Sequence, residues 1–201
     1  EAAHEADFVM ETIAETKDAK QQLYAELNGL CPERTVFASN TSSLNIFELV
    51  PAARRPRTVI AHFFAPAHII PLVEVVPAPE TAAETVSSVA SLFEALGKSP
   101  VVMRKFGPGF IVNRIARPFY GEAWRAYTEG AADPATIDAI VRDCGGFPMG
   151  PFELMDLIGH DVNLAVSTSV FEATFGERRY APSLAQQELV RAGRLGRKTG
   201  R

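Results

Sequence analysis

Short apolar runs alternate with amphipathic stretches over the first half of this chain of 201 residues. The runs rich in β-branched or aromatic residues predict buried strands at 7–13, 35–39, 58–63, 71–76 and 100–103. Helices are expected at 16–27, where Asn28 and Gly29 would stop the helix, at 46–49 and at 82–96. Strands that alternate with helices predict an α/β layered domain.

The second half of the chain has a different pattern. Gly107, Pro108 and Gly109 form a cluster of residues that break helices and strands, and strand-like runs are scarce after it. Helices are expected at 111–127, where Pro118 would kink or end the helix, and at 134–141, 152–158 and 183–192. We therefore expect an α/β domain at 1–104 and a mostly helical domain at 105–201.

The bulk composition is that of an ordinary globular protein, with 47% hydrophobic and 22% charged residues. The formal net charge of −4 argues against nucleic acid as a partner, because phosphate binding normally needs a basic surface. No apolar run is long enough to span a bilayer, and the first residues lack the features of a signal peptide, so we expect a cytoplasmic protein without a membrane partner. The cysteines and histidines show no ligand spacing, so no metal site is expected.

One ionisable side chain interrupts each of two neighbouring apolar runs. His62 lies within 61–66 and Glu74 within 72–76. Burying a polar group without a partner is costly, and Glu is almost never fully buried unless it is paired, so the two side chains are predicted to be partners. A His held by a carboxylate accepts a proton near neutral pH, which favours an enzyme over the alternative of a core histidine with satisfied hydrogen bonds.

Other polar residues have two interpretations each. Ser42 or Ser43 follows a predicted strand and could meet His62 and Glu74 at the carboxyl ends of the strands, or could cap the next helix. Asn113, among apolar residues, could offer its amide to a substrate carbonyl or tie two helices together. Taken alone, Glu15, Lys20 and Lys198 are typical of a solvated surface.

Five linked motifs resemble the L-3-hydroxyacyl-CoA dehydrogenase family, in particular its 3-hydroxybutyryl-CoA dehydrogenase-like members. They are FASNTSSL at 37–44, AHFFAP at 61–66, LVEVV at 72–76, GPGFIVNR at 107–114 and PMGPFEL at 148–154. They occur in the family's order and at close to its spacing. The resemblance implies the C-terminal part of a Rossmann-type dinucleotide-binding domain, followed by an all-helical domain that binds substrate and forms a homodimer.

The resemblance also implies site residues and an activity. His62 resembles the family's general base, Glu74 the carboxylate that orients it, Ser42 the active-site serine and Asn113 the asparagine that contacts substrate. Glu15, Lys20, Ser42 and Lys198 resemble positions that touch NAD. The implied reaction, part of fatty acid metabolism, is hydride transfer between C3 of an L-3-hydroxyacyl-CoA and NAD.

The chain departs from the family pattern in two ways. Ala65 stands where the family usually has Asn, so acyl specificity or cofactor geometry can differ. No Gly-x-Gly-x-x-Gly turn is present among the 201 residues; in the family it precedes the position of Asp7, so we expect a chain truncated at both ends.

Three other functions stay open. The substrate could be a free 3-hydroxy acid, or the chain could be a non-catalytic fragment that lacks the main cofactor anchor. Ser42, His62 and Glu74 could also form a hydrolase triad, although Ser42 lacks the Gly-x-Ser-x-Gly turn that exposes such a nucleophile.

Overall fold

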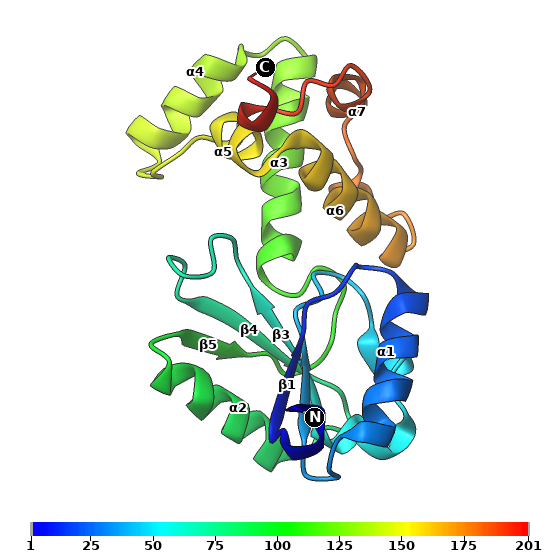
Figure 1. Ribbon diagram of the computed structural model, residues 1–201. Coiled ribbons are helices and arrows are strands. Elements are labelled where there is room, and N and C mark those ends of the chain that lie inside the picture. The colour runs from blue at the N-terminus through cyan, green and yellow to red at the C-terminus, as the bar shows by residue number, and fades with distance from the viewer. Residues whose placement is uncertain (1, 201) are drawn as a thin grey trace. The chain divides into compact units, whose positions relative to one another are not determined.

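The computed structural model describes residues 2–200 and divides the chain into two compact units, one ending at Ile111 and one beginning at Val112 (Figure 1). The sequence placed this boundary near residue 104. The first unit extends further because Phe110 is buried in its core and the Ile111 N–H donates to the carboxylate of Glu74. The breaker cluster at 107–109 therefore lies inside the first unit.

A five-stranded sheet organises the first unit. Its strands are β1 (Phe8–Glu11), β2 (Val36–Ser39), β3 (Thr58–Phe63), β4 (Leu72–Pro77) and β5 (Ser99–Val102), and they lie side by side in chain order. Neighbouring strands run parallel except β3 and β4, which are antiparallel. The sheet confirms the expected α/β layers and places the carboxyl ends of β1, β2 and β3 at one edge.

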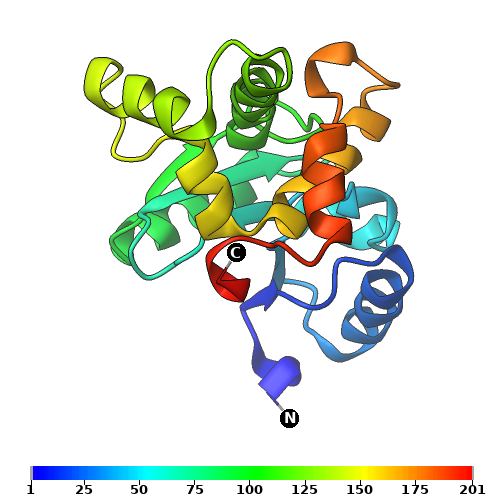
Figure 2. The same ribbon diagram turned by 90° about the horizontal axis from the view of Figure 1, so that it is seen from above.

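One helix covers each face of this sheet, as Figure 1 and Figure 2 show for α1 (Lys17–Leu30) and α2 (Ala83–Ala95). Side chains alternate between the faces along each strand. Phe37 and Ile60 belong to the core that includes Tyr24 of α1, and the intervening Ala38 and Val59 belong to the core of α2. Burial on both faces explains why these strands read as nearly continuous apolar runs.

The sequence predicted that the first helix stops at Asn28 and Gly29. Helix α1 instead continues to Leu30. Its last carbonyls have a partner that the sequence did not reveal: the buried guanidinium of Arg54 donates to the carbonyls of Asn28 and Cys31 at 3.1 and 2.6 Å. Orphan carbonyls at a helix C-terminus need such donors. Arg54 comes from the 3₁₀ segment Ala52–Arg57, and the expected short helix at 46–49 is a 3₁₀ turn, Ile46–Glu48.

The second unit is helical. Its elements are α3 (Val112–Thr128), α4 (Pro134–Ala139) with a π-helical turn (Ile140–Cys144), α5 (Pro151–Ile158), α6 (His160–Ala173) and α7 (Leu184–Arg191). Pro118 lies inside α3 without ending it. The sequence missed α6 because its buried face carries the polar residues His160, Asn163 and Ser167, which hide the apolar period of a helix.

Candidate active site

His62 and Glu74 form a direct cross-strand pair between β3 and β4. Nδ1 of His62 lies 2.8 Å from Oε2 of Glu74, and the two side chains are 7% and 1% exposed. The sequence predicted this contact from the cost of burying each group alone. It also placed each group at the end of a strand, which is wrong for Glu74: that residue lies in the middle of β4, and the antiparallel register brings it opposite His62.

Further contacts to this pair come from the segment after β5 and from Phe64, which follows β3. The Ile111 N–H donates to Oε1 of Glu74 at 2.8 Å, so each carboxylate oxygen has a donor. The rings of Phe64 and Phe110 pack edge-on against the imidazole at centroid distances of 4.6 and 5.4 Å. The Glu74 carboxylate and the two aromatic rings together hold the imidazole of His62 in place.

Phe110 reaches this position through an unusual backbone. Its φ is 49°, in the left-handed region that side chains other than glycine rarely adopt, and Gly109 before it has a φ of 75°. The Phe110 N–H closes the turn by donating to the carbonyl of Gly107 at 2.9 Å. The sequence analysis took 107–109 as a cluster of breakers and 107–114 as a family motif, but gave Phe110 no role of its own. A glycine-rich turn followed by a large aromatic residue was the available signal for a constrained site.

The hydrogen bonds determine what the imidazole can do. An ionised carboxylate only accepts hydrogen bonds, so beside an ionised Glu74 the neutral imidazole carries its proton on Nδ1 and its lone pair on Nε2. Nε2 forms no hydrogen bond with a residue among 2–200, and it is not one of the fully buried unpartnered atoms. A neutral His with a free Nε2 and a carboxylate behind Nδ1 has the geometry of a general base.

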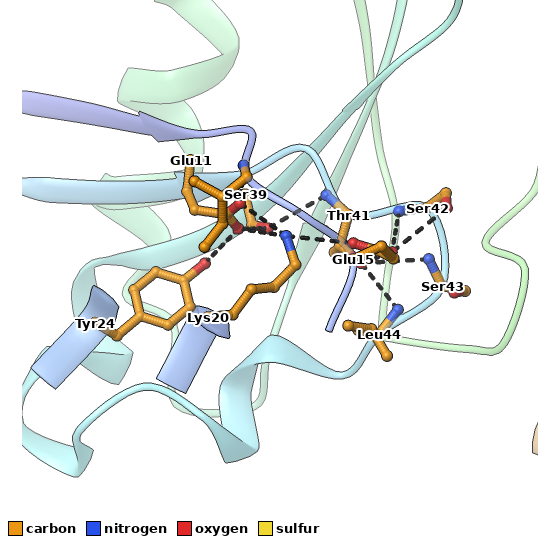
Figure 3. Close-up of polar contacts among 10 residues, drawn as sticks. Glu11, Glu15, Lys20, Tyr24, Ser39, Thr41, Ser42, Ser43 and Leu44 are labelled. Atoms are coloured by element: carbon orange, nitrogen blue, oxygen red, sulfur yellow. Dashed lines mark hydrogen bonds and ion pairs between the residues drawn. The ribbon is translucent and has the colours of Figure 1, made fainter. Parts of the chain in front are cut away.

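A second polar cluster begins on the same face of the sheet, at Glu11 on β1 (Figure 3). Its carboxylate accepts hydrogen bonds from the Ile13 N–H at 2.7 Å, from Lys20 at 2.7 and 2.8 Å, from the Tyr24 hydroxyl at 3.0 Å and from the Ser39 hydroxyl at 2.6 Å. Burial alone would raise the pKa of Glu11, but the hydrogen bonds from Lys20, Ser39 and the Ile13 backbone outweigh it and hold the pKa below its ordinary value.

Lys20 and Glu15 are not the solvated surface pair that their charges suggested. Lys20 is 1% exposed and binds Glu11, while its contact with Oε2 of Glu15 is 3.2 Å. Only Glu15, with a side chain 37% exposed, reaches solvent. The sequence reasoning missed Glu11, although a carboxylate in the apolar run of β1 was the same signal that identified Glu74.

Glu15 in turn holds the loop after β2. Its Oε1 accepts from the Thr41 hydroxyl at 2.5 Å, from the Ser42 N–H at 3.0 Å and from the Ser42 hydroxyl at 3.4 Å (Figure 3). The capping role considered for the serines is not filled, because the 3₁₀ turn Ile46–Glu48 has no side-chain cap. Thr41 closes the preceding loop instead: its Oγ1 accepts from the Leu44 N–H at 2.9 Å. Because the Ser42 hydroxyl bonds to Glu15 and not to His62, the hydrolase triad is not formed.

Asn40 connects this loop to the strand that carries the histidine. Its side-chain carbonyl accepts from the Phe63 N–H at 2.9 Å, one residue beyond His62. The sequence reasoning treated Asn40 only as part of a turn. The bond ties the end of β2 to the end of β3, so the Ser42 loop and His62 belong to one scaffold.

Two predicted site residues lie in the second unit, which is described by itself. Asn113 accepts from Arg117 at 3.4 Å, and Arg117 is buried against the Tyr120 ring, 4.9 Å from its centroid. Burial lowers the pKa of Arg117 to about 10, so it stays charged at neutral pH. Lys198 binds the carboxylate of Asp161 at 2.5 and 2.7 Å.

Within residues 2–200, no group of three or more His, Cys, Asp or Glu side chains could hold a metal ion. No helix in the same part of the chain is long and apolar enough to cross a membrane.

Family models match both units. Residues 1–106 match the 3-hydroxyacyl-CoA dehydrogenase NAD binding domain, and residues 109–201 match the 3-hydroxyacyl-CoA dehydrogenase C-terminal domain. The chain belongs to the 3-hydroxyacyl-CoA dehydrogenase family. This confirms the resemblance read from the five motifs, the Rossmann-type first domain and NAD as the cofactor of the family.

Individual relatives agree with the family. The chain is 52% identical to 3-hydroxyadipyl-CoA dehydrogenase of Escherichia coli K12 over 97% of its length, and 40% identical to a probable 3-hydroxybutyryl-CoA dehydrogenase of Bacillus subtilis over 100%. It matches the crystal structure of an E. coli 3-hydroxybutyryl-CoA dehydrogenase over 99% of its length, with a TM-score of 0.94 and 50% identity. The chain spans 41%, 70% and 42% of these three proteins, respectively.

Proposed function

We propose that this chain is the catalytic part of an NAD-dependent 3-hydroxyacyl-CoA dehydrogenase. The observation that carries the proposal is the buried hydrogen bond of 2.8 Å between His62 and Glu74, within a domain of the 3-hydroxyacyl-CoA dehydrogenase family. A His–carboxylate pair supplies the base that oxidation of an alcohol requires.

The roles of the residues follow from this geometry. Nε2 of His62 takes the proton from the 3-hydroxyl group as C3 gives up hydride. The carboxylate of Glu74 orients the imidazole and stabilises the imidazolium that forms, because it lies 2.8 Å from Nδ1. Ser42 and Asn113 hold substrate oxygen atoms, a role that rests on the family resemblance. NAD, when bound, supplies the hydride acceptor.

The first unit offers groups that suit a dinucleotide. Ligands of open α/β sheets bind outside the carboxyl ends of the parallel strands, where Glu15 and Ser42 lie. The partly exposed carboxylate of Glu15 can accept hydrogen bonds from ribose hydroxyls, and the hydroxyl of Ser42 lies beside it. The assignments of Lys20 and Lys198 to the cofactor rest on the family resemblance.

An acyl-CoA thioester is the proposed substrate because the relatives are named for acyl-CoA substrates. A free 3-hydroxy acid is the alternative, since Ala65 replaces the asparagine of the family next to the site. Homodimerisation through the second unit and a cytoplasmic location remain predictions from the family resemblance and the sequence.

NADH oxidation by the full-length protein tests the reaction class. We expect acetoacetyl-CoA to support oxidation with a kcat/KM at least about 100-fold above that of free acetoacetate, because binding of the CoA part contributes to the transition state. Equal activity with the free acid would favour the alternative substrate. Failure to enhance NADH fluorescence, together with no turnover, would favour a non-catalytic role.

A further inference from the structure

Lys20 has no N–H group left for a ligand. Its Nζ lies 2.7 and 2.8 Å from the two carboxylate oxygens of Glu11 and 3.2 Å from Oε2 of Glu15. Three acceptors therefore face the three N–H groups of the ammonium. With only 1% of the residue exposed, Lys20 exerts its charge through the side chains that it holds.

Glu15 is the accessible member of this group. Its Oε1 accepts from Thr41 and Ser42, whereas Oε2 contacts Lys20 alone among the described residues. A carboxylate oxygen can accept two hydrogen bonds, so Oε2 keeps capacity for a hydroxyl of a ligand. A carboxylate held on both sides is already oriented when that ligand arrives, which lowers the entropic cost of binding.

Glu11 lies behind both residues and is 2% exposed. The two carboxylates and one ammonium leave one net negative charge, and only Glu15 exposes it to solvent. The Tyr24 and Ser39 hydroxyls complete the shell of donors around Glu11. Without Glu11, the buried ammonium would lose its two shortest contacts and its link to β1.

We propose that Glu11 is a positioning residue of the cofactor site. Through Lys20 it holds the carboxylate of Glu15, and through Glu15 it holds the backbone and hydroxyl of Ser42. This inference rests on the proposed function, in which Glu15 and Ser42 contact NAD.

The first test is the dissociation constant of NADH, measured by fluorescence in the full-length protein. Glu11→Gln should raise it about tenfold, which corresponds to about 1.4 kcal/mol. The KM for the acyl-CoA should change less than about twofold, because Glu11 acts on the cofactor side. Tyr24→Phe is the matched control: it removes a donor to the same carboxylate without altering Lys20, so the dissociation constant should stay within about twofold.

A double variant separates positioning from stability. Glu11→Gln with Lys20→Met replaces the buried ion pair by neutral side chains of similar size, and such replacements often restore stability. We expect the Tm to return toward the wild-type value while the dissociation constant of NADH stays about tenfold raised, because Glu15 has lost its holder. Recovery of wild-type affinity would overturn the proposal and show that the pair only stabilises the fold.

Glu15→Gln distinguishes this inference from the proposed function. If Glu15→Gln weakens NADH binding and Glu11→Gln does not, the positioning role of Glu11 is overturned and the proposed function stands. If neither variant weakens binding, both the positioning role and the assignment of Glu15 to the cofactor fall. A full-length protein that does not bind NADH would overturn the proposed function itself.

Discussion

The Glu74 carboxylate has two tasks that one side chain must perform together. One oxygen accepts from Nδ1 of His62, and the other accepts from the Ile111 N–H, each at 2.8 Å. Glu74→Gln keeps the shape but leaves a single acceptor oxygen for the two donors. We expect kcat to fall at least about tenfold, because the imidazolium loses its counter-charge and the ring loses its orientation.

Steady-state kinetics with a saturating acyl-CoA measure this effect. The KM for NADH should stay within about twofold, because Glu74 does not contact the proposed cofactor groups. A Glu74→Gln enzyme with a kcat within about twofold of the wild type would show that the carboxylate does not assist the histidine.

Burial arguments predict pairs of residues only when both members interrupt apolar runs. His62 and Glu74 do so, and their contact followed from the sequence. Glu11 interrupts an apolar run too, but its partner Lys20 lies on the polar-looking start of α1. Lys20 reaches Glu11 only because α1 packs against the sheet beside β1. Sequence spacing does not predict this packing.

At the scale of elements, Arg54 joins the 3₁₀ segment 52–57 to the end of α1. Its guanidinium donates to the backbone carbonyls of Asn28, Cys31 and Pro32 and to the side chain of Asn28. Its Cζ also lies 5.2 Å from the centroid of the Phe37 ring. Arg54→Met should lower the free energy of unfolding by about 2–4 kcal/mol, because several carbonyls lose a charged donor.

Chemical denaturation measures this loss, with Arg57→Met as the matched control in the same segment. Arg57 forms one long hydrogen bond of 3.4 Å, so its replacement should cost less than about 0.5 kcal/mol. Equal effects of the two variants would contradict the capping role of Arg54.

Most elements followed from the sequence because strands buried on both faces and amphipathic helices have distinct periods. The exceptions have physical causes. Arg54 lets α1 continue past Gly29, and the polar buried face of α6 conceals its helical period. Local sequence patterns do not predict contacts between residues far apart in the chain, or helices whose buried face is polar.

At the scale of the whole molecule, the buried carboxylate of Glu11 should make the free energy of unfolding depend on pH. The pKa of Glu11 lies below its ordinary value of 4.5 in the fold and returns to it on unfolding. A carboxyl of this kind stabilises the fold above pH 4.5, and the contribution is lost as the pH falls through the folded-state pKa. The free energy of unfolding should therefore fall with pH below about 4.5.

Urea titrations between pH 3 and pH 7 measure this dependence. Glu11→Gln should be less stable than the wild type at neutral pH and should lose less stability on acidification, because its side chain does not titrate. Identical pH dependence in the two proteins would show that Glu11 is not the group responsible.

The chain as a whole carries one part of the family's sequence pattern. The 201 residues contain the motifs that identify the family but no Gly-x-Gly-x-x-Gly turn, and they span 41% of the E. coli 3-hydroxyadipyl-CoA dehydrogenase. The proposed base, His62 with Glu74, could be named from the apolar runs that the two residues interrupt.

The kcat of His62→Gln tests the central claim most directly, since this one side chain is proposed to exchange a proton with the substrate oxygen, as the base in oxidation and as the acid in reduction. With acetoacetyl-CoA and NADH, His62→Gln in the full-length protein should reduce kcat by about 10²- to 10⁴-fold, with the dissociation constant of NADH within about twofold of the wild type. His68→Gln, at an exposed position six residues later, should keep full activity. A His62→Gln enzyme that retains more than about a tenth of the wild-type kcat would contradict the account.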